Sequence, residues 1–181
     1  MTATPTSLQG VLILEPEVFV DPRGVFFESY NQRRFEETTG SRAPFVQDNH
    51  STSARHVLRG LHYQVKRPQA KLVRVTAGEV FDVSVDLRRN SPTFGRWVGV
   101  ILSADNRKQL WIPEGFGHGF LTLSDDAAVV YKTTDYYAPD CERTIRWDDP
   151  ALAITWPITS PPILSTKDAA GQLLAAAEVF A

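Results

Sequence analysis

This sequence has almost no cysteine and no strong net charge. Cys141 is the only cysteine among 181 residues, which excludes an internal disulfide and a zinc site built from several cysteines. The chain has 19 lysines and arginines against 21 aspartates and glutamates, so it lacks the basic excess typical of duplex-binding proteins. We therefore expect no nucleic-acid partner, and the single cysteine suits a reducing compartment.

Long apolar runs and cofactor fingerprints are also missing. The longest early apolar run, 11–14, is far too short to span a bilayer, and the N-terminal MTATPTSLQG does not resemble a secretory signal. We expect no membrane association and a cytoplasmic location. The sequence has no Gly-x-Gly-x-x-Gly fingerprint for a dinucleotide, which agrees with chemistry that needs no cofactor.

Helical periodicity is scarce, whereas short apolar segments separated by turn signals fill most of the chain. The clearest is VFDVSVDL (80–87), in which apolar and polar side chains alternate from Phe81 to Leu87. The predicted strands are 11–14, 25–30, 45–51, 57–64, 71–77, 80–87, 95–102, 109–112, 119–123, 127–133 and 144–147. Many short strands without regular intervening helices favour an all-β sandwich or barrel.

Two short helices are predicted outside these strands. The stretch NQRRFEETTG has Asn31 as a helix N-cap and Gly40 as its terminator, and a second helix is expected in the tail AAGQLLAAAEVF. The length fits one domain spanning residues 1–181. Its last part, about 156–181, is predicted to be an irregular strap over the β body.

Histidine is the most informative titratable residue of this chain. Of the four, His62 in LHYQ and His118 in PEGFGHGF are the candidate ligands for a metal, but two imidazoles with no obvious third ligand make a weak site. We therefore expect no bound metal. A metal-free acid–base site is the alternative, because histidine titrates near neutral pH and can act as a general base.

Such a site needs companions, and the sequence offers several. A carboxylate usually fixes the tautomer of a catalytic histidine, and Asp168 and Asp82 are both candidates. Tyr131 could act as the acid, and Lys71 could neutralise a developing oxyanion. Each residue also has an ordinary structural interpretation: a core histidine, a core tyrosine or a charge protecting a strand edge. Composition and spacing alone predict only a β-rich domain with a small-ligand site.

The motifs taken in order are more specific than any one of them. In order they are DPRGVFFESYN, FVQDNHSTS, VLRGLHYQ, KLVRVTAGEVFDVSVDLR, SPTFGRWVG, LWIPEGFGHGFLTLSD, YKTTDYYAPDCERTIRWDDP and LSTKD, and the resemblance they carry runs from about residue 11 to residue 168. This series strongly resembles the dTDP-4-dehydrorhamnose 3,5-epimerases. The resemblance implies a cupin-like jelly roll with few short helices, acting as a homodimer without metal or cofactor.

The resemblance also implies an activity. Enzymes of this family epimerise dTDP-4-dehydro-6-deoxy-D-glucose at C3 and C5 to dTDP-4-dehydro-L-rhamnose, on the way to dTDP-L-rhamnose for lipopolysaccharide or cell-wall polysaccharide. By resemblance His62 is the base, Tyr131 the acid, Asp168 the partner of His62, and Lys71 the support of the enolate. The residues expected around the nucleotide sugar are Arg23, Phe26, Glu28, Gln47, Asn49, Arg59, His118, Tyr137, Glu142 and Lys167, with Tyr137 stacked on the thymine.

Two hypotheses go beyond the resemblance. Arg59 and His62 fall on opposite faces of an ideal strand, so if both reach one ligand, Gly60 should mark a bulge or bend. The stretch DPRGVFFESYN is predicted to cross to a partner subunit, so that Arg23, Phe26 and Glu28 complete the neighbour's site.

Three other functions stay open at this point. A related dTDP-4-keto-sugar enzyme that inverts one carbon, or isomerises the keto position, could retain the same base and acid. A barrel that only binds nucleotide sugars would not need the four proposed catalytic residues together. A metal-dependent cupin oxygenase would contain a stoichiometric, essential iron.

Overall fold

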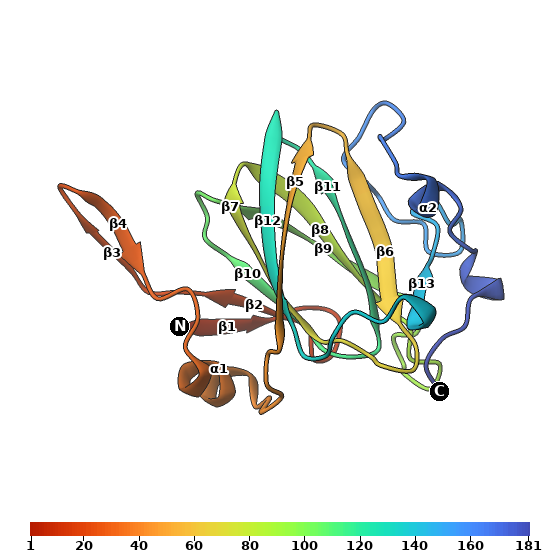
Figure 1. Cartoon of the computed structure of the whole chain (residues 1–181), viewed down its shortest axis with the longest axis horizontal. Helices are drawn as coiled ribbons and strands as arrows, with labels where there is room; N and C mark the ends of the chain where they lie inside the picture. The colour runs from red at the N-terminus through yellow and green to blue at the C-terminus, as the bar shows by residue number, and fades with distance from the viewer.

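Two antiparallel sheets face each other in the computed structural model, which describes residues 1–181 (Figure 1). In spatial order, the six-stranded sheet consists of β1 (Thr2–Pro5), β2 (Leu12–Glu15), β10 (Gln109–Ile112), β7 (Lys71–Ala77), β12 (Asp126–Thr133) and β5 (Gln47–Ala54). The five-stranded sheet consists of β13 (Glu142–Thr144), β6 (Leu58–Gln64), β11 (Phe116–Thr122), β8 (Glu79–Asp86) and β9 (Trp97–Ser103). The predicted all-β, cupin-like jelly roll is confirmed.

The alternation predicted for VFDVSVDL is present in β8, but its polar face points into the barrel. Val83 and Val85 belong to an apolar cluster on the outer side of the five-stranded sheet. Asp82 and Ser84 face the six-stranded sheet and are fully buried. The space between the sheets therefore holds an apolar cluster at one end, around Val73, and ionisable groups at the other.

The C-terminal part of the chain covers the outer face of the five-stranded sheet. It contains the short helix α2 (Thr166–Ala169) and the 3-10 turn η2 (Leu174–Ala176), and its other residues are irregular. Trp156 packs against Phe81 there, with ring centroids 5.9 Å apart. The helix predicted in the tail of this segment is wrong: only η2 forms there, and Leu174 packs against the apolar cluster on the sheet.

The helix α1 (Gln32–Thr39) begins and ends where the sequence predicts. The Asn31 side chain accepts a hydrogen bond from the backbone N–H of Arg34, and Gly40 has φ of 74°, the left-handed conformation that ends many helices. Its buried Phe35 packs edge-on against Trp111 of the six-stranded sheet. No helix in the structure is long and apolar enough to cross a membrane.

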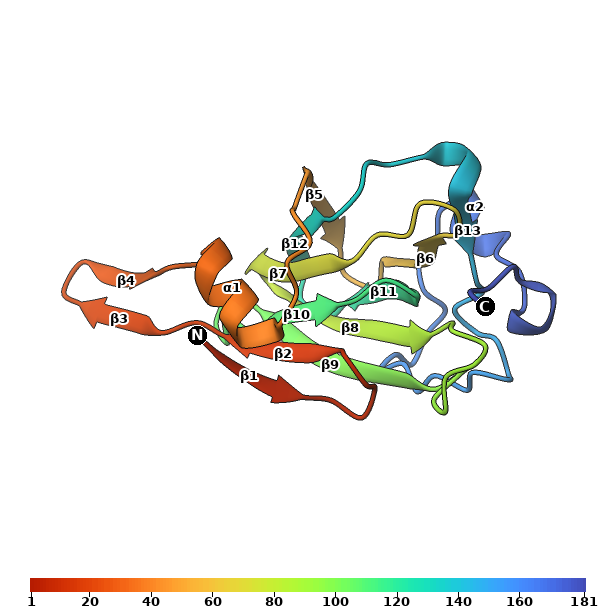
Figure 2. The same cartoon turned by 90° about the horizontal axis from the view of Figure 1, so that it is seen from below.

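A two-stranded hairpin projects from the body of the molecule (Figures 1 and 2). It consists of β3 (Val18–Asp21) and β4 (Gly24–Phe27), whereas the sequence predicts only one strand, at 25–30. Phe19, Val20 and Phe26 are 55%, 75% and 71% exposed, although apolar side chains of this size are normally buried. These exposed side chains therefore lack a covering surface within the chain, and an isolated hairpin is at best marginally stable in water.

Candidate active site

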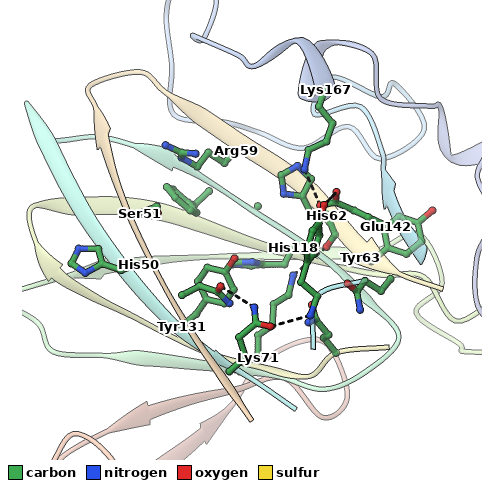
Figure 3. A pocket seen from close by; sticks show the side chains of 17 residues that line it. His50, Ser51, Arg59, His62, Tyr63, Lys71, His118, Tyr131, Glu142 and Lys167 are labelled. Carbon is green, nitrogen blue, oxygen red and sulfur yellow. Dashed lines mark hydrogen bonds and ion pairs between the residues drawn. The ribbon is translucent and has the colours of Figure 1, made fainter. Parts of the chain in front are cut away.

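A polar cavity of about 390 Å³ opens between the two sheets (Figure 3). Only 4 of the 17 residues that line it are hydrophobic, so it suits a polar, charged ligand. The predicted site residues that line it are Gln47, Asn49, Arg59, His62, Lys71, His118, Tyr131, Tyr137, Glu142 and Lys167. The structure thus brings together residues from both sheets and from α2.

The strand β6 reaches this cavity through a bulge at Gly60, as predicted. Opposite β11, His62 pairs with His118 and Arg59 with Phe120, so β6 carries one residue more than β11 over this interval. Gly60 has φ of 120°, and a Cβ there would lie 2.5 Å from the Cα of Gly119. Only glycine fits this close approach of two backbones. The extra residue turns both Arg59 and His62 toward the cavity.

The imidazole of His62 pairs with the carboxylate of Asp168. The distance from His62 Nε2 to Asp168 Oδ1 is 2.5 Å, and the other oxygen of Asp168 accepts a hydrogen bond from Ser165 at 2.8 Å. Ser165 is also the N-cap of α2, so the cap of this helix orients the carboxylate. Of the two carboxylates that the sequence offers for His62, the structure pairs Asp168 with it.

Burial and pairing act on this pair in opposite directions. Burial lowers the pKa of His62 below its ordinary value, and the nearby carboxylate of Asp168 offsets only part of that effect. Burial would raise the pKa of Asp168, but hydrogen bonds from His62, Ser165 and the Gly60 backbone N–H outweigh it and lower that pKa. Near neutral pH the imidazole is therefore neutral and the carboxylate ionised, which is the state a general base needs.

Tyr131 and Lys71 come from the facing sheet. Tyr131 lies on β12 beside Asn49 of β5, and burial raises the pKa of its phenol, which stays protonated. Lys71 begins β7, is 7% exposed, and donates to the backbone carbonyl of His62 at 3.3 Å. Burial lowers the pKa of Lys71 to about 8, against the opposing effect of Asp82 and Glu142.

His118 lies on β11 and is also paired, but with Asp82. Its Nε2 is 2.9 and 3.0 Å from the two carboxylate oxygens of Asp82. The alternative in which Asp82 partners His62 is therefore wrong. Adjacent β8 and β11 place Asp82 beside His118, whereas His62 lies one strand further away.

A second cluster of site residues lies where the cavity opens. Glu142 accepts hydrogen bonds from the hydroxyl of Tyr137 at 3.0 Å and from the ammonium of Lys167 at 2.8 Å. Burial would raise the pKa of Glu142, but these two partners outweigh it and lower the pKa. Gln47 donates to the Asn49 side chain at 2.9 Å and accepts from the backbone N–H of Tyr137 at 3.0 Å.

Arg59 presents a partly free guanidinium at the other side of the opening. Its Nε donates to the hydroxyl of Ser53 at 2.9 Å, and one Nη donates to the Thr52 carbonyl at 3.1 Å. It forms no salt bridge within the chain, so its charge is available to an anionic ligand.

The structure does not bring Arg23, Phe26 and Glu28 to this cavity. Arg23 sits at the tip of the projecting hairpin, where it pairs with Asp21 at 2.5 Å. Glu28 follows the hairpin and accepts a hydrogen bond from the N-cap residue Asn31 at 3.1 Å. Within one chain these predicted ligands are therefore remote from the others, because the hairpin extends away from the barrel (Figure 1).

Sequence reasoning missed Gln64, which also lines the cavity. Its amide donates to the carbonyls of Arg67 and Tyr136 and accepts from the N–H of Ala138 at 2.8 Å. These bonds hold the loop that carries Tyr137. Its position two residues after His62, on the same face of the strand, was the available signal.

Comparison with known proteins identifies what this chain resembles. The family model described as dTDP-4-dehydrorhamnose 3,5-epimerase matches residues 5–176. An enzyme of that name from Pseudomonas aeruginosa is 60% identical over 180 residues, with 99% of each chain covered. No group of three or more His, Cys, Asp or Glu side chains in the structure is arranged to hold a metal ion.

Two solved structures bear on the ligand. A Legionella pneumophila dTDP-6-deoxy-D-glucose-3,5-epimerase in complex with dTDP-4-keto-L-rhamnose has a TM-score of 0.96 and 52% identity, covering 98% of this chain and 94% of that one. A Streptomyces bikiniensis 3'-monoepimerase in complex with dTDP-quinovose has a TM-score of 0.89 and 38% identity, covering 97% and 88%. Both are structures that this chain resembles.

Proposed function

The chain belongs to the dTDP-4-dehydrorhamnose 3,5-epimerase family, and from that premise we propose how its cavity inverts C3 and C5 of dTDP-4-dehydro-6-deoxy-D-glucose. Both carbons flank the C4 ketone, so the carbonyl acidifies their protons. Removing either proton leaves an enolate with negative charge on O4. Inversion then requires a proton to return on the opposite face of the ring, giving dTDP-4-dehydro-L-rhamnose.

One observation carries this proposal: a base and an acid extend from opposing sheets into one cavity. Neutral His62 accepts the proton, and the ionised carboxylate of Asp168 stabilises the imidazolium that results. Tyr131, kept protonated by the raised pKa of its phenol, returns a proton from the other side. The ammonium of Lys71 stabilises the enolate oxygen, a contribution typically worth about 100-fold or more in rate.

The opening of the cavity suits the nucleotide part of the substrate. Arg59 is available for the diphosphate, because guanidinium binds phosphate oxygens in a bidentate manner. The half-exposed ring of Tyr137 offers a surface for the thymine, next to the amide groups of Gln47 and Asn49. Glu142 and Lys167 complete this side of the ligand, and His118 lies deeper, beside the sugar.

The proposal includes a homodimer in which each hairpin completes the neighbour's site. The hairpin exposes Phe19 and Phe26 in a pair, with ring centroids 6.4 Å apart, and Arg23 lies at its tip. Burial of these side chains against a second copy would remove their contact with water and bring Arg23 near a ligand. We also assign the enzyme to the cytoplasm and to dTDP-L-rhamnose supply for surface polysaccharide, which cell fractionation and a deletion strain would test.

Deuterium exchange tests the function directly. We expect the enzyme to exchange both the C3 and C5 protons of dTDP-4-dehydro-6-deoxy-D-glucose in deuterated water, as followed by proton NMR. A coupled 4-keto reductase should then form dTDP-L-rhamnose. Exchange at one carbon only would instead support a monoepimerase, and binding without any exchange would refute the enzymatic role.

Complementation between two inactive variants tests the shared site. If the hairpin of one subunit serves the other, co-expressed His62→Ala and Arg23→Ala chains form heterodimers with one intact site and recover activity. If each site is built from one chain, every site in the mixture carries a defect and no activity returns. Two differently tagged His62→Ala chains provide the matched control, which should stay inactive.

A further inference from the structure

Asp82 is a fully buried carboxylate beside the cavity, and the chemistry proposed above gives it no part. It lies on the inner face of β8 with 0% of its surface exposed. A carboxylate removed from water is costly unless hydrogen bonds or opposite charges compensate it. The groups that compensate the charge of Asp82 therefore indicate its role.

The first group that compensates Asp82 is the imidazole of His118. Both oxygens of the carboxylate lie within 3.0 Å of Nε2, which is the geometry expected when Nε2 carries a proton and the carboxylate accepts the hydrogen bond. Nδ1 of His118 makes no hydrogen bond within the chain and is not among the fully buried polar atoms without a partner. With His118 in the cavity wall, Nδ1 is left as the ring nitrogen available to a ligand.

The second group is the ammonium of Lys71, whose only hydrogen bond is to a carbonyl. Asp82 is the strongest of the charges that favour its protonated form, followed by Glu142 of β13, and Lys167 of α2 opposes them. The titratable groups that line the same cavity include His62 on β6, His118 on β11 and Tyr131 on β12.

We infer that Asp82 is a positioning residue for the epimerisation: it fixes which nitrogen His118 presents to the sugar, and it holds the positive charge of Lys71 for the enolate. The inference rests on the proposed function. Asp82 itself does not line the cavity, so it acts through these two residues without touching the substrate.

The test is a variant that removes the negative charge of Asp82 and keeps the shape of the side chain. Asp82→Asn keeps an oxygen acceptor for His118 and removes the negative charge beside Lys71. In the wild type, activity should fall as pH rises through about 8, where Lys71 loses its proton. Without Asp82 the charged form of Lys71 is less stable, so the fall should move to lower pH by about one unit, with kcat lowered about tenfold and KM nearly unchanged.

Asp105→Asn, at an exposed site, is the control and should leave the pH profile of kcat unchanged. If Asp82→Asn lowers thermal stability but leaves the alkaline limb unmoved, the carboxylate is only structural and the inference fails. If the wild type itself exchanges neither C3 nor C5 protons, the proposed function fails instead.

A measurement on the wild type keeps the inference testable if Asp82→Asn does not fold. Nitrogen-15 NMR of labelled histidine, with His118→Asn used to assign the signal, reports which ring nitrogen carries the proton. From the geometry of the pair with Asp82 we expect a proton on Nε2. A His118 tautomer with its proton on Nδ1 alone would overturn the inference.

Discussion

The two faces of the five-stranded sheet are built for different tasks. The outer face is apolar and excluded from solvent: Leu61 and Val83 are fully buried under the C-terminal segment. The inner face of the same strands carries Asp82, Ser84 and His118, all buried and all polar. The difference teaches that much of this sheet's hydrophobic stabilisation lies outside the barrel, which leaves the interior free to hold charges.

The C-terminal segment connects these two faces. Trp156 seals the outer cluster, and its indole N–H donates to the carbonyl of Trp147 at 2.8 Å. Further along, the same segment forms α2, from which Asp168 reaches His62. One stretch of chain thus both completes the outer core and orients the proposed base.

The largest effect is expected from removing the base. His62→Ala should lower the rate of deuterium exchange by about 1,000-fold or more, because no other neutral imidazole in the cavity pairs with Asp168. The free energy of unfolding should change far less than the rate, since Asp168 keeps its hydrogen bonds from Ser165 and the Gly60 backbone N–H. Urea unfolding measured beside the exchange rate provides the check, and a large loss of stability with only modest loss of rate would contradict this division.

The next largest effect is expected at the Gly60 bulge of β6, which turns residues of this strand toward the cavity. Gly60→Ala places a Cβ 2.5 Å from Gly119 at a φ of 120°, so we expect a loss of about 3 kcal/mol in unfolding free energy and a large loss of activity. Gly40→Ala, at an open C-cap, is the matched control and should cost about 1 kcal/mol without affecting kcat. Normal stability of Gly60→Ala would show that β6 does not need the bulge.

A smaller effect separates two neighbours on β8. Val83→Ala removes two methyl groups from the outer cluster and should cost about 2 kcal/mol of unfolding free energy. Ser84→Ala removes a buried hydroxyl that has no hydrogen-bond partner, so its effect should be close to zero or stabilising, because an unsatisfied group costs about 1–3 kcal/mol. Equal losses in urea unfolding for the two variants would contradict the comparison.

The sequence predicts much of this because its signals are local. Alternation in β8 predicts a strand, and the Asn31 cap together with Gly40 predicts a helix, in both cases without reference to distant residues. The bulge at Gly60 could also be predicted, because Arg59 and His62 are both expected to reach one ligand in spite of their odd spacing, and the register of β6 and β11 contains it.

The remaining features depend on contacts between distant segments. Alternation does not indicate which face of β8 is covered, since that depends on a segment more than sixty residues later. The choice between Asp82 and Asp168 as partner of His62 likewise depends on strand order, which periodicity does not report. The strand β1 is a short polar edge strand whose pairing with β2 gives no pattern of its own.

Tyr131→Phe tests the central claim that base and acid act from opposing sheets. The variant keeps the ring and removes the hydroxyl, so His62 can still take a proton while the other face has no donor. We expect proton NMR in deuterated water to show exchange continuing without inversion, with formation of the L-rhamnose product suppressed far more than exchange. If exchange and inversion fall by the same factor, His62 and Tyr131 do not act as separate base and acid, and the central claim is contradicted.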